Sequence, residues 1–194
     1  MIDKGFKGKV IILSAPSGAG KTTIVKKLLA SGMPLRFSIS ACNRTQRPNE
    51  KNGLDYHFLS TQEFKTKIKE NAFIEWEEVY ENSFYGTLKN EIDKIWLSQK
   101  HVIFDVDVIG GISLKKYFKQ KALSIFINPP SIDVLFYRLK ERATDDSESL
   151  KRRMEKAKSE LAHKNKFDKI ITNDQLEIAV LETTDLVRKF INEK

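Results

Sequence analysis

The sequence predicts an α/β fold in which a central, mostly parallel β-sheet is flanked by helices. Three observations support this prediction. Short continuous apolar runs alternate with amphipathic segments, a pattern typical of strands that helices cover on both faces. A glycine-rich turn joins the first apolar run to the first amphipathic segment. The 194 residues are 40% hydrophobic and 31% charged, which is the composition of one ordinary globular domain.

The apolar runs predict the strands of the central sheet. They are VIIL at 10–13, VIFDVDV at 102–108, SIFI at 124–127 and KIIT at 169–172. The amphipathic segments between them predict helices at 22–31, 61–70, 88–98, 132–142, 150–162 and 176–191. Ser60 and Glu63 form a capping box at the start of the second helix, and Thr87 is expected to begin the third.

Two intervals depart from this alternation. Residues 38–88 combine short β-like pieces, FSIS and YHFL, with turn residues and aromatics, and so predict a small β-rich insert. Residues 138–169 are highly charged, with lysine and arginine in excess. They fit either a solvated helical hairpin or a basic lid over an anionic substrate. The expected core therefore comprises residues 1–37, 89–137 and 170–194 of a single domain.

Composition excludes several classes of protein. The only cysteine is Cys42 and the three histidines are far apart, so neither an internal disulfide nor a Cys- or His-rich metal site is expected. A reducing, cytoplasmic location follows. No apolar stretch reaches the roughly 18 residues of a membrane span, and the run at 10–13 is too short for a signal peptide. The net charge of +8 favours anionic partners, although no aromatic–basic motif indicates nucleic acid.

The strongest motif is a phosphate-binding loop at residues 15–22, Ala-Pro-Ser-Gly-Ala-Gly-Lys-Thr. It lies between a predicted strand and a predicted helix, as this motif requires. Glycines allow backbone N–H groups to point inward at a phosphate, toward which the helix directs its positive end. We expect Lys21 to neutralise the β- and γ-phosphates of a nucleotide and the Thr22 hydroxyl to bind Mg²⁺. Ala15 stands where the general pattern has glycine, and a turn that merely caps a helix is the alternative interpretation.

Residues of the insert indicate what receives the phosphate. Arg44 and Arg47, three residues apart, can present paired donors to one dianionic phosphate. Tyr56 and Tyr85 can stack on a base or donate to a phosphate. Glu75 can accept hydrogen bonds from a base that carries adjacent N–H donors. Taken singly, the two tyrosines also fit core aromatics, and Glu75 also fits a surface carboxylate.

Taken together, these motifs resemble the guanylate kinase family. The resemblance rests on Ser-x-x-x-Arg-x-x-Arg-Pro from Ser40, Phe-Ile-Glu-Trp at 73–76, Tyr-Gly-Thr at 85–87 and the acidic pair Asp105 and Asp107. It extends from the phosphate loop to residues 171–174. It implies a P-loop kinase fold with a GMP-binding insert and a helical lid, and an enzyme that uses Mg²⁺ to transfer the γ-phosphate of ATP to GMP.

The resemblance also implies roles for individual residues. It implies that Lys21, Arg44, Arg142 and Arg153 are catalytic. ATP binding falls to the loop and its neighbours, namely Ala15, Pro16, Ser17, Gly18, Ala19, Gly20, Lys21, Thr22, Thr23, Arg138 and Asn173. GMP binding falls to Ser40, Arg44, Arg47, Tyr56, Glu75, Tyr85, Thr87, Asp105 and Asp107. One departure is Ile109, because the family usually has glutamine there.

Other interpretations remain open. A phosphotransferase acting on a ribose phosphate would have no base for Glu75 to bind. A guanylate-kinase-like module that binds phosphopeptides without turnover would not need an intact phosphate loop and lid arginines. Neither a nucleic-acid partner nor a membrane partner is expected, and the sequence leaves a homo-oligomer open.

Overall fold

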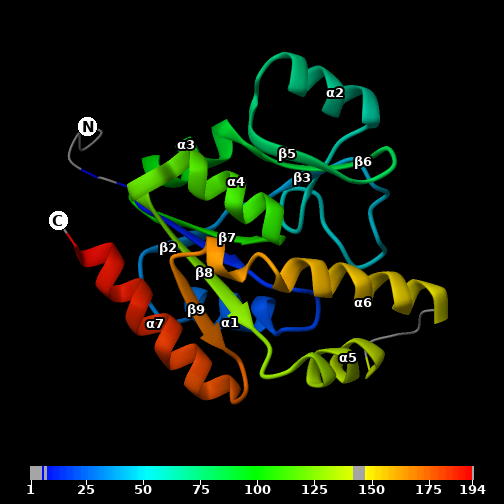
Figure 1. Ribbon diagram of the computed structural model, residues 1–194. Helices are drawn as coiled ribbons and strands as arrows, with labels where there is room; N and C mark the ends of the chain where they lie inside the picture. The colour runs from blue at the N-terminus through cyan, green and yellow to red at the C-terminus, as the bar shows by residue number, and fades with distance from the viewer. Residues whose placement is uncertain (1–5, 7, 142–146, 194) are drawn as a thin grey trace.

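A five-stranded parallel sheet forms the centre of the molecule. The computed structural model describes residues 6, 8–141 and 147–193. The strand order is β2-β7-β1-β8-β9 (Figure 1). The strands are β1 (Val10–Ser14), β2 (Leu35–Phe37), β7 (His101–Val106), β8 (Ala122–Asn128) and β9 (Lys169–Thr172). The predicted α/β class with a parallel sheet is thus confirmed.

The central strand β1 is buried on both faces, because helices cover both sides of the sheet. Ile11 and Leu13 belong to the apolar cluster on the side of α1 (Lys21–Leu29) and α7 (Leu176–Asn192). Val10 and Ile12 belong to the cluster on the side of α3 (Lys89–Leu97) and α4 (Val108–Phe118). Alternate side chains of a strand point to opposite faces, so this continuous apolar run serves two cores.

The insert is a second, four-stranded sheet of order β4-β3-β6-β5, and α2 packs against it (Figure 1). Its elements are β3 (Ala41–Cys42), β4 (His57–Phe58), α2 (Thr61–Lys69), β5 (Phe73–Tyr80) and β6 (Ser83–Leu88). It has its own core, in which the Phe64 ring stacks on Phe73 and Phe84 at centroid distances of 4.5 and 5.5 Å. The capping box of Ser60 and Glu63 is present as predicted.

Helices α5 (Ile132–Glu141) and α6 (Ser147–Leu161) lie beside one another next to the phosphate loop (Figure 1). Single turns at Lys119–Lys121 and Lys164–Lys166 complete the described elements. Leu135 and Leu139 of α5 are fully buried in the main core. The boundaries of the insert and lid at 38–88 and 138–169 remain predictions. No helix among the described residues is long and apolar enough to cross a membrane.

The structure corrects several local predictions. The strand expected over 102–108 ends at Val106, because Asp107 caps helix α4, which the sequence analysis did not predict. The FSIS piece begins inside the core rather than the insert, because its first residue, Phe37, ends the unpredicted strand β2 and pairs with Ile103. Thr87 lies in β6 rather than starting α3. Helix α6 begins at Ser147, three residues before the predicted start.

Helix α4 was missed because Gly110 and Gly111 weaken its helical pattern. The structure gives the reason for Gly111: a Cβ added there would lie 2.2 Å from Ser14 Oγ of β1. The glycine therefore lets α4 pack closely against the central strand, a requirement that local propensity does not reveal.

Candidate active site

The phosphate loop joins β1 to α1 at the carboxyl end of the central strand. Gly18 and Gly20 have φ angles of 91° and 92°, a left-handed conformation that residues with a Cβ rarely adopt. The loop lines a cavity of about 330 Å³. The loop residues on this cavity are Ala15, Pro16, Ser17, Gly18, Gly20, Lys21 and Thr22. Helix α1 begins at Lys21, so its N-terminal end is directed toward the loop.

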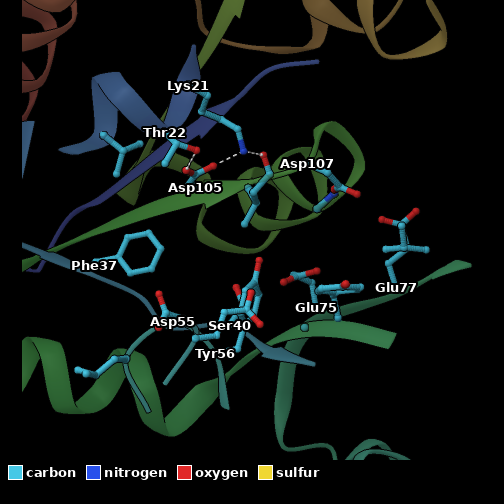
Figure 2. Close-up of a pocket in the computed structure, with 18 of the residues that line it drawn as sticks. Lys21, Thr22, Phe37, Ser40, Asp55, Tyr56, Glu75, Glu77, Asp105 and Asp107 are labelled. Carbon is cyan, nitrogen blue, oxygen red and sulfur yellow. Dashed lines mark hydrogen bonds and ion pairs between the residues drawn. The ribbon is translucent and has the colours of Figure 1, made fainter. Parts of the chain in front are cut away.

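Lys21, Thr22 and Asp105 form a compact polar cluster (Figure 2). Lys21 Nζ makes an ion pair with the Asp105 carboxylate and donates to the Val106 carbonyl at 2.7 Å. Thr22 Oγ1 donates to Asp105 Oδ2, also at 2.7 Å. Asp105 is on β7, opposite Leu13 of β1, so neighbouring strands of the sheet bring the three side chains together.

Two residues predicted to bind ATP lie behind the loop. Asn173 is buried, and its Nδ2 donates to the Ala19 carbonyl at 2.8 Å. Arg138 donates to the Asn173 carbonyl at 3.3 and 3.4 Å. Neither residue is among those that line the two cavities at the loop, and neither is Thr23 of α1. Asn173 thus supports the loop directly and Arg138 contacts Asn173, while their roles in ATP binding stay predictions.

Helix α6 contributes charged side chains to the loop cavity. Arg153 Nη2 donates to Ser17 Oγ at 3.3 Å, as a lid arginine would. Lys156 and Glu160, which the sequence analysis did not single out, line the same cavity. Burial raises the pKa of Glu160 to about 7, partly offset by the charges of Lys156 and Lys21. The predicted catalytic residue Arg142 lies outside the described residues.

A second cavity, of about 610 Å³, lies between the central sheet and the insert (Figure 2). The predicted GMP-binding residues on its wall are Ser40, Tyr56, Glu75, Tyr85, Asp105 and Asp107. Lys21, Thr22 and Asp107 line both this cavity and the loop cavity. Two phosphorylated ligands, one in each cavity, would therefore meet at Lys21 and Thr22.

Arg44 is held beside the second cavity by a carboxylate that the sequence analysis missed. Its two terminal nitrogens donate to the two oxygens of Glu50 at 2.6 and 2.5 Å, and Glu50 also accepts from the Arg47 N–H at 2.9 Å. The Arg44 guanidinium lowers the pKa of Glu50 to about 2, and Glu50 raises the pKa of Arg44. The guanidinium also lies over the Tyr56 ring, 4.9 Å from its centroid.

Three predicted GMP-binding residues do not line the second cavity, namely Arg44, Arg47 and Thr87. Arg44 contacts its lining residues Glu50 and Tyr56, whereas the Arg47 side chain is exposed, and the contact of Arg47 with GMP stays a prediction. The only sequence signal for Glu50 was an acidic residue shortly after two arginines, which equally fits a surface turn.

Glu75 and Thr87 are opposite one another on β5 and β6. Thr87 Oγ1 donates to Glu75 Oε1 at 2.7 Å, and Thr87 is fully buried. The pKa of Glu75 is raised to about 7, mainly by burial; the bond from Thr87 lowers it, and the nearby carboxyls of Asp107 and Glu77 contribute to the rise. Glu75 is therefore a carboxyl group with a fixed orientation that gains or loses its proton near neutral pH.

Asp107 serves both as a helix cap and as part of the cavity walls. Its Oδ1 accepts from the Gly110 N–H at 2.7 Å and so caps α4, yet the residue also lines both cavities. Glu77, another residue not singled out from sequence, lies beside Asp107 on the wall of the second cavity (Figure 2). Ile109 is 43% exposed in the first turn of α4.

The fold and the two adjoining cavities define a P-loop phosphotransferase, in which a phosphate loop on a parallel sheet lies next to a second site built for another ligand. A solved shikimate kinase from Bacteroides thetaiotaomicron has the same general fold, with a TM-score of 0.51 at 17% identity over 93% of this chain and 98% of its own.

Residues 7–190 match the family model for guanylate kinase, so the chain belongs to the guanylate kinase family. It is 46% identical over 191 residues to a guanylate kinase of Bacteroides thetaiotaomicron, covering 98% of this chain and 94% of the relative. It is 50% identical over 188 residues to one of Bacteroides fragilis, covering 97% and 92%. The crystal structure of guanylate kinase from Anaplasma phagocytophilum matches with a TM-score of 0.77 at 25% identity, covering 97% of this chain and 89% of that one. The family resemblance and the P-loop kinase fold inferred from sequence are thereby confirmed.

Proposed function

We propose that this protein transfers the γ-phosphate of ATP to GMP, giving ADP and GDP. The observation that carries the proposal is the pair of adjoining cavities. One is lined by the phosphate loop and the other by Glu75, Tyr56 and Tyr85, and they share Lys21 and Thr22. This arrangement would bring the donor phosphate and the acceptor phosphate to a single point.

Phosphoryl transfer requires positioning and neutralisation of charge rather than a nucleophilic side chain. Lys21 from α1 and Arg153 from α6 would both supply positive charge to the loop cavity. The ion pair of Lys21 with Asp105 must loosen as Lys21 Nζ turns to the phosphates. Arg142 remains a proposed second lid arginine.

The residues at this point also suit Mg²⁺. Thr22 Oγ1 and Asp105 Oδ2 lie 2.7 Å apart at the junction of the two cavities. Mg²⁺ prefers oxygen ligands and is usually held by one or two protein groups together with substrate phosphates. Thr22 would bind the ion and Asp105 would orient its water ligands, and the ion would neutralise charge on the transferring group.

The second cavity would hold the acceptor and is called the acceptor cavity below. In it, Arg44 would hold the GMP phosphate together with Tyr56 and Tyr85. Glu50 occupies one edge of the Arg44 guanidinium and fixes the direction of its remaining N–H donors. Glu75, oriented by Thr87, would accept from guanine N1–H and the 2-amino group. Adenine presents a lone pair at N1 and would leave this buried carboxylate without a donor.

A coupled assay of ADP release tests the proposal. The acceptors are GMP, AMP, UMP, CMP and dTMP at saturating Mg-ATP, and the matched variants are Lys21→Ala and Lys27→Ala. We expect strong preference for GMP, loss of turnover in Lys21→Ala and normal turnover in Lys27→Ala, because Lys27 is exposed on α1. No turnover with any acceptor, together with retained binding of a phosphoserine peptide, would show a binding module instead.

We also propose a cytoplasmic location. Cys42 is a free cysteine buried in the insert, and a reducing compartment suits a chain without disulfides. ATP and GMP are the expected partners. Fractionation of cells that express the tagged protein would test the location.

A further inference from the structure

Glu77 has a carboxyl oxygen for which the structure supplies no donor. Glu75 and Glu77 are two residues apart on β5, so their side chains share the face that borders the acceptor cavity (Figure 2). Glu77 Oε2 is buried, and no group among the described residues donates to it. An acceptor buried without a donor is costly, and native proteins keep such groups mainly where they have a function.

The neighbour of Glu77 is another acceptor. The carboxyl groups of Glu77 and Asp107 are within hydrogen-bonding reach, but a bond between two carboxyls requires a proton on one of them. Burial and the Asp107 carboxyl both raise the pKa of Glu77, and the charge of Lys156 lowers it. Asp107 Oδ1 is already committed to the Gly110 N–H. The pair thus has more acceptor capacity than the surrounding protein uses.

The position of this pair suggests its ligand. A Cβ added at Gly110 would lie 3.0 Å from Asp107 Oδ1 and 3.6 Å from Glu75 Oε2, so Glu75 and Asp107 flank the same point. A metal ion is the less suitable occupant, because no group of three or more acidic, histidine or cysteine side chains in the described part of the chain could hold one. A better occupant than a metal ion is a neutral N–H group of the same ligand whose neighbouring donors bind Glu75.

We propose that Glu77 is a specificity-determining residue, which together with Asp107 accepts the second hydrogen of the guanine 2-amino group. Glu75 can take the N1 hydrogen and one amino hydrogen, which leaves the other amino hydrogen in need of an acceptor. The Glu77 oxygen supplies it from the next inward-facing position of β5. The inference rests on the proposed function, because it refines how the acceptor base is recognised.

Comparison of GMP with IMP, which lacks the 2-amino group, tests the inference. We measure kcat/KM for both acceptors in the wild type, Glu77→Ala and Glu77→Gln, and confirm folding by thermal unfolding. In Glu77→Ala the GMP/IMP ratio should fall about tenfold, the lower end of what a hydrogen bond to a charged group supplies. Glu77→Gln retains one acceptor oxygen and should lie between the alanine variant and the wild type. Glu78→Gln is the matched control, since Glu78 is exposed on the opposite face of β5 and the substitution keeps an acceptor for the Asn82 N–H.

The inference is overturned if the GMP/IMP ratio of kcat/KM in folded Glu77→Ala lies within twofold of the wild-type ratio. If the GMP/dGMP ratio of kcat/KM falls in the same variant, Glu77 binds the ribose 2′-hydroxyl instead. Failure of the wild type to phosphorylate GMP would refute the proposed function itself and is therefore a distinguishable result.

Discussion

Lowering the pH should weaken GMP binding through Glu75. Only the ionised carboxylate can accept two guanine hydrogens, and burial raises the pKa of Glu75 to about 7. About nine-tenths of this group is then ionised at pH 8 and about one-tenth at pH 6. GMP must expel the proton at the lower pH, so its Kd should be about tenfold higher at pH 6 than at pH 8. Protonation of the GMP phosphate, with a second pKa of about 6, adds roughly a further twofold.

Isothermal titration calorimetry at pH 6, 7 and 8 measures this change, with Glu75→Gln as the control. The glutamine variant binds GMP more weakly but retains the titration of the phosphate and of Glu77, so the difference in pH slope between the two proteins isolates Glu75. Repeating the titration at pH 7 in buffers of different ionisation enthalpy should show that the wild type releases about half a proton more than Glu75→Gln. Equal pH slopes in the two proteins would refute the assignment of Glu75 as an ionisable group that binds guanine.

Three further predictions concern other parts of the site and the core. Arg44→Lys should raise the KM for GMP at least tenfold in steady-state assays although the charge is kept, because the lysine ammonium lacks the planar, paired donors with which a guanidinium binds Glu50 and a phosphate together; an unchanged KM would refute the proposed role of Arg44 in binding the GMP phosphate. Gly111→Ala should destabilise the protein by about 1–3 kcal/mol in urea unfolding, since the new Cβ meets Ser14 Oγ; wild-type stability would show that α4 shifts without cost. Small-angle scattering should show compaction when both nucleotides bind, because the site must exclude water to prevent ATP hydrolysis; identical curves would argue against closure.

The sequence was most informative where one short segment carries its own physical requirement. The phosphate loop needs glycines at positive φ next to a helix start, and Gly18, Gly20 and Lys21 satisfy this within four residues. The capping box at Ser60 is similarly local. The faces of β1 could also be predicted, because an uninterrupted apolar run has few alternatives in a small α/β domain.

Features that depend on distant contacts could not be predicted. Glu77 has the alternating position of an ordinary strand residue, and only the folded chain brings it to Asp107. The bond from the Asn173 amide to the Ala19 carbonyl of the loop joins residues at opposite ends of the sequence, so no local pattern predicts it. Glu50 resembles a residue of a surface turn until its bonds to Arg44 are seen.

The bond from Asn173 to Ala19 has a consequence for synthesis of the chain. It joins residues 154 positions apart in the sequence, and Asn173 follows the last strand of the sheet. Strand β1 likewise pairs only with β7 and β8 among the described strands. Contacts of such long separation form late and slow the folding of a domain. A ribosome-bound chain that ends before β9 lacks the Asn173 support of the loop, so we expect nucleotides to stabilise the nascent chain less than the finished one.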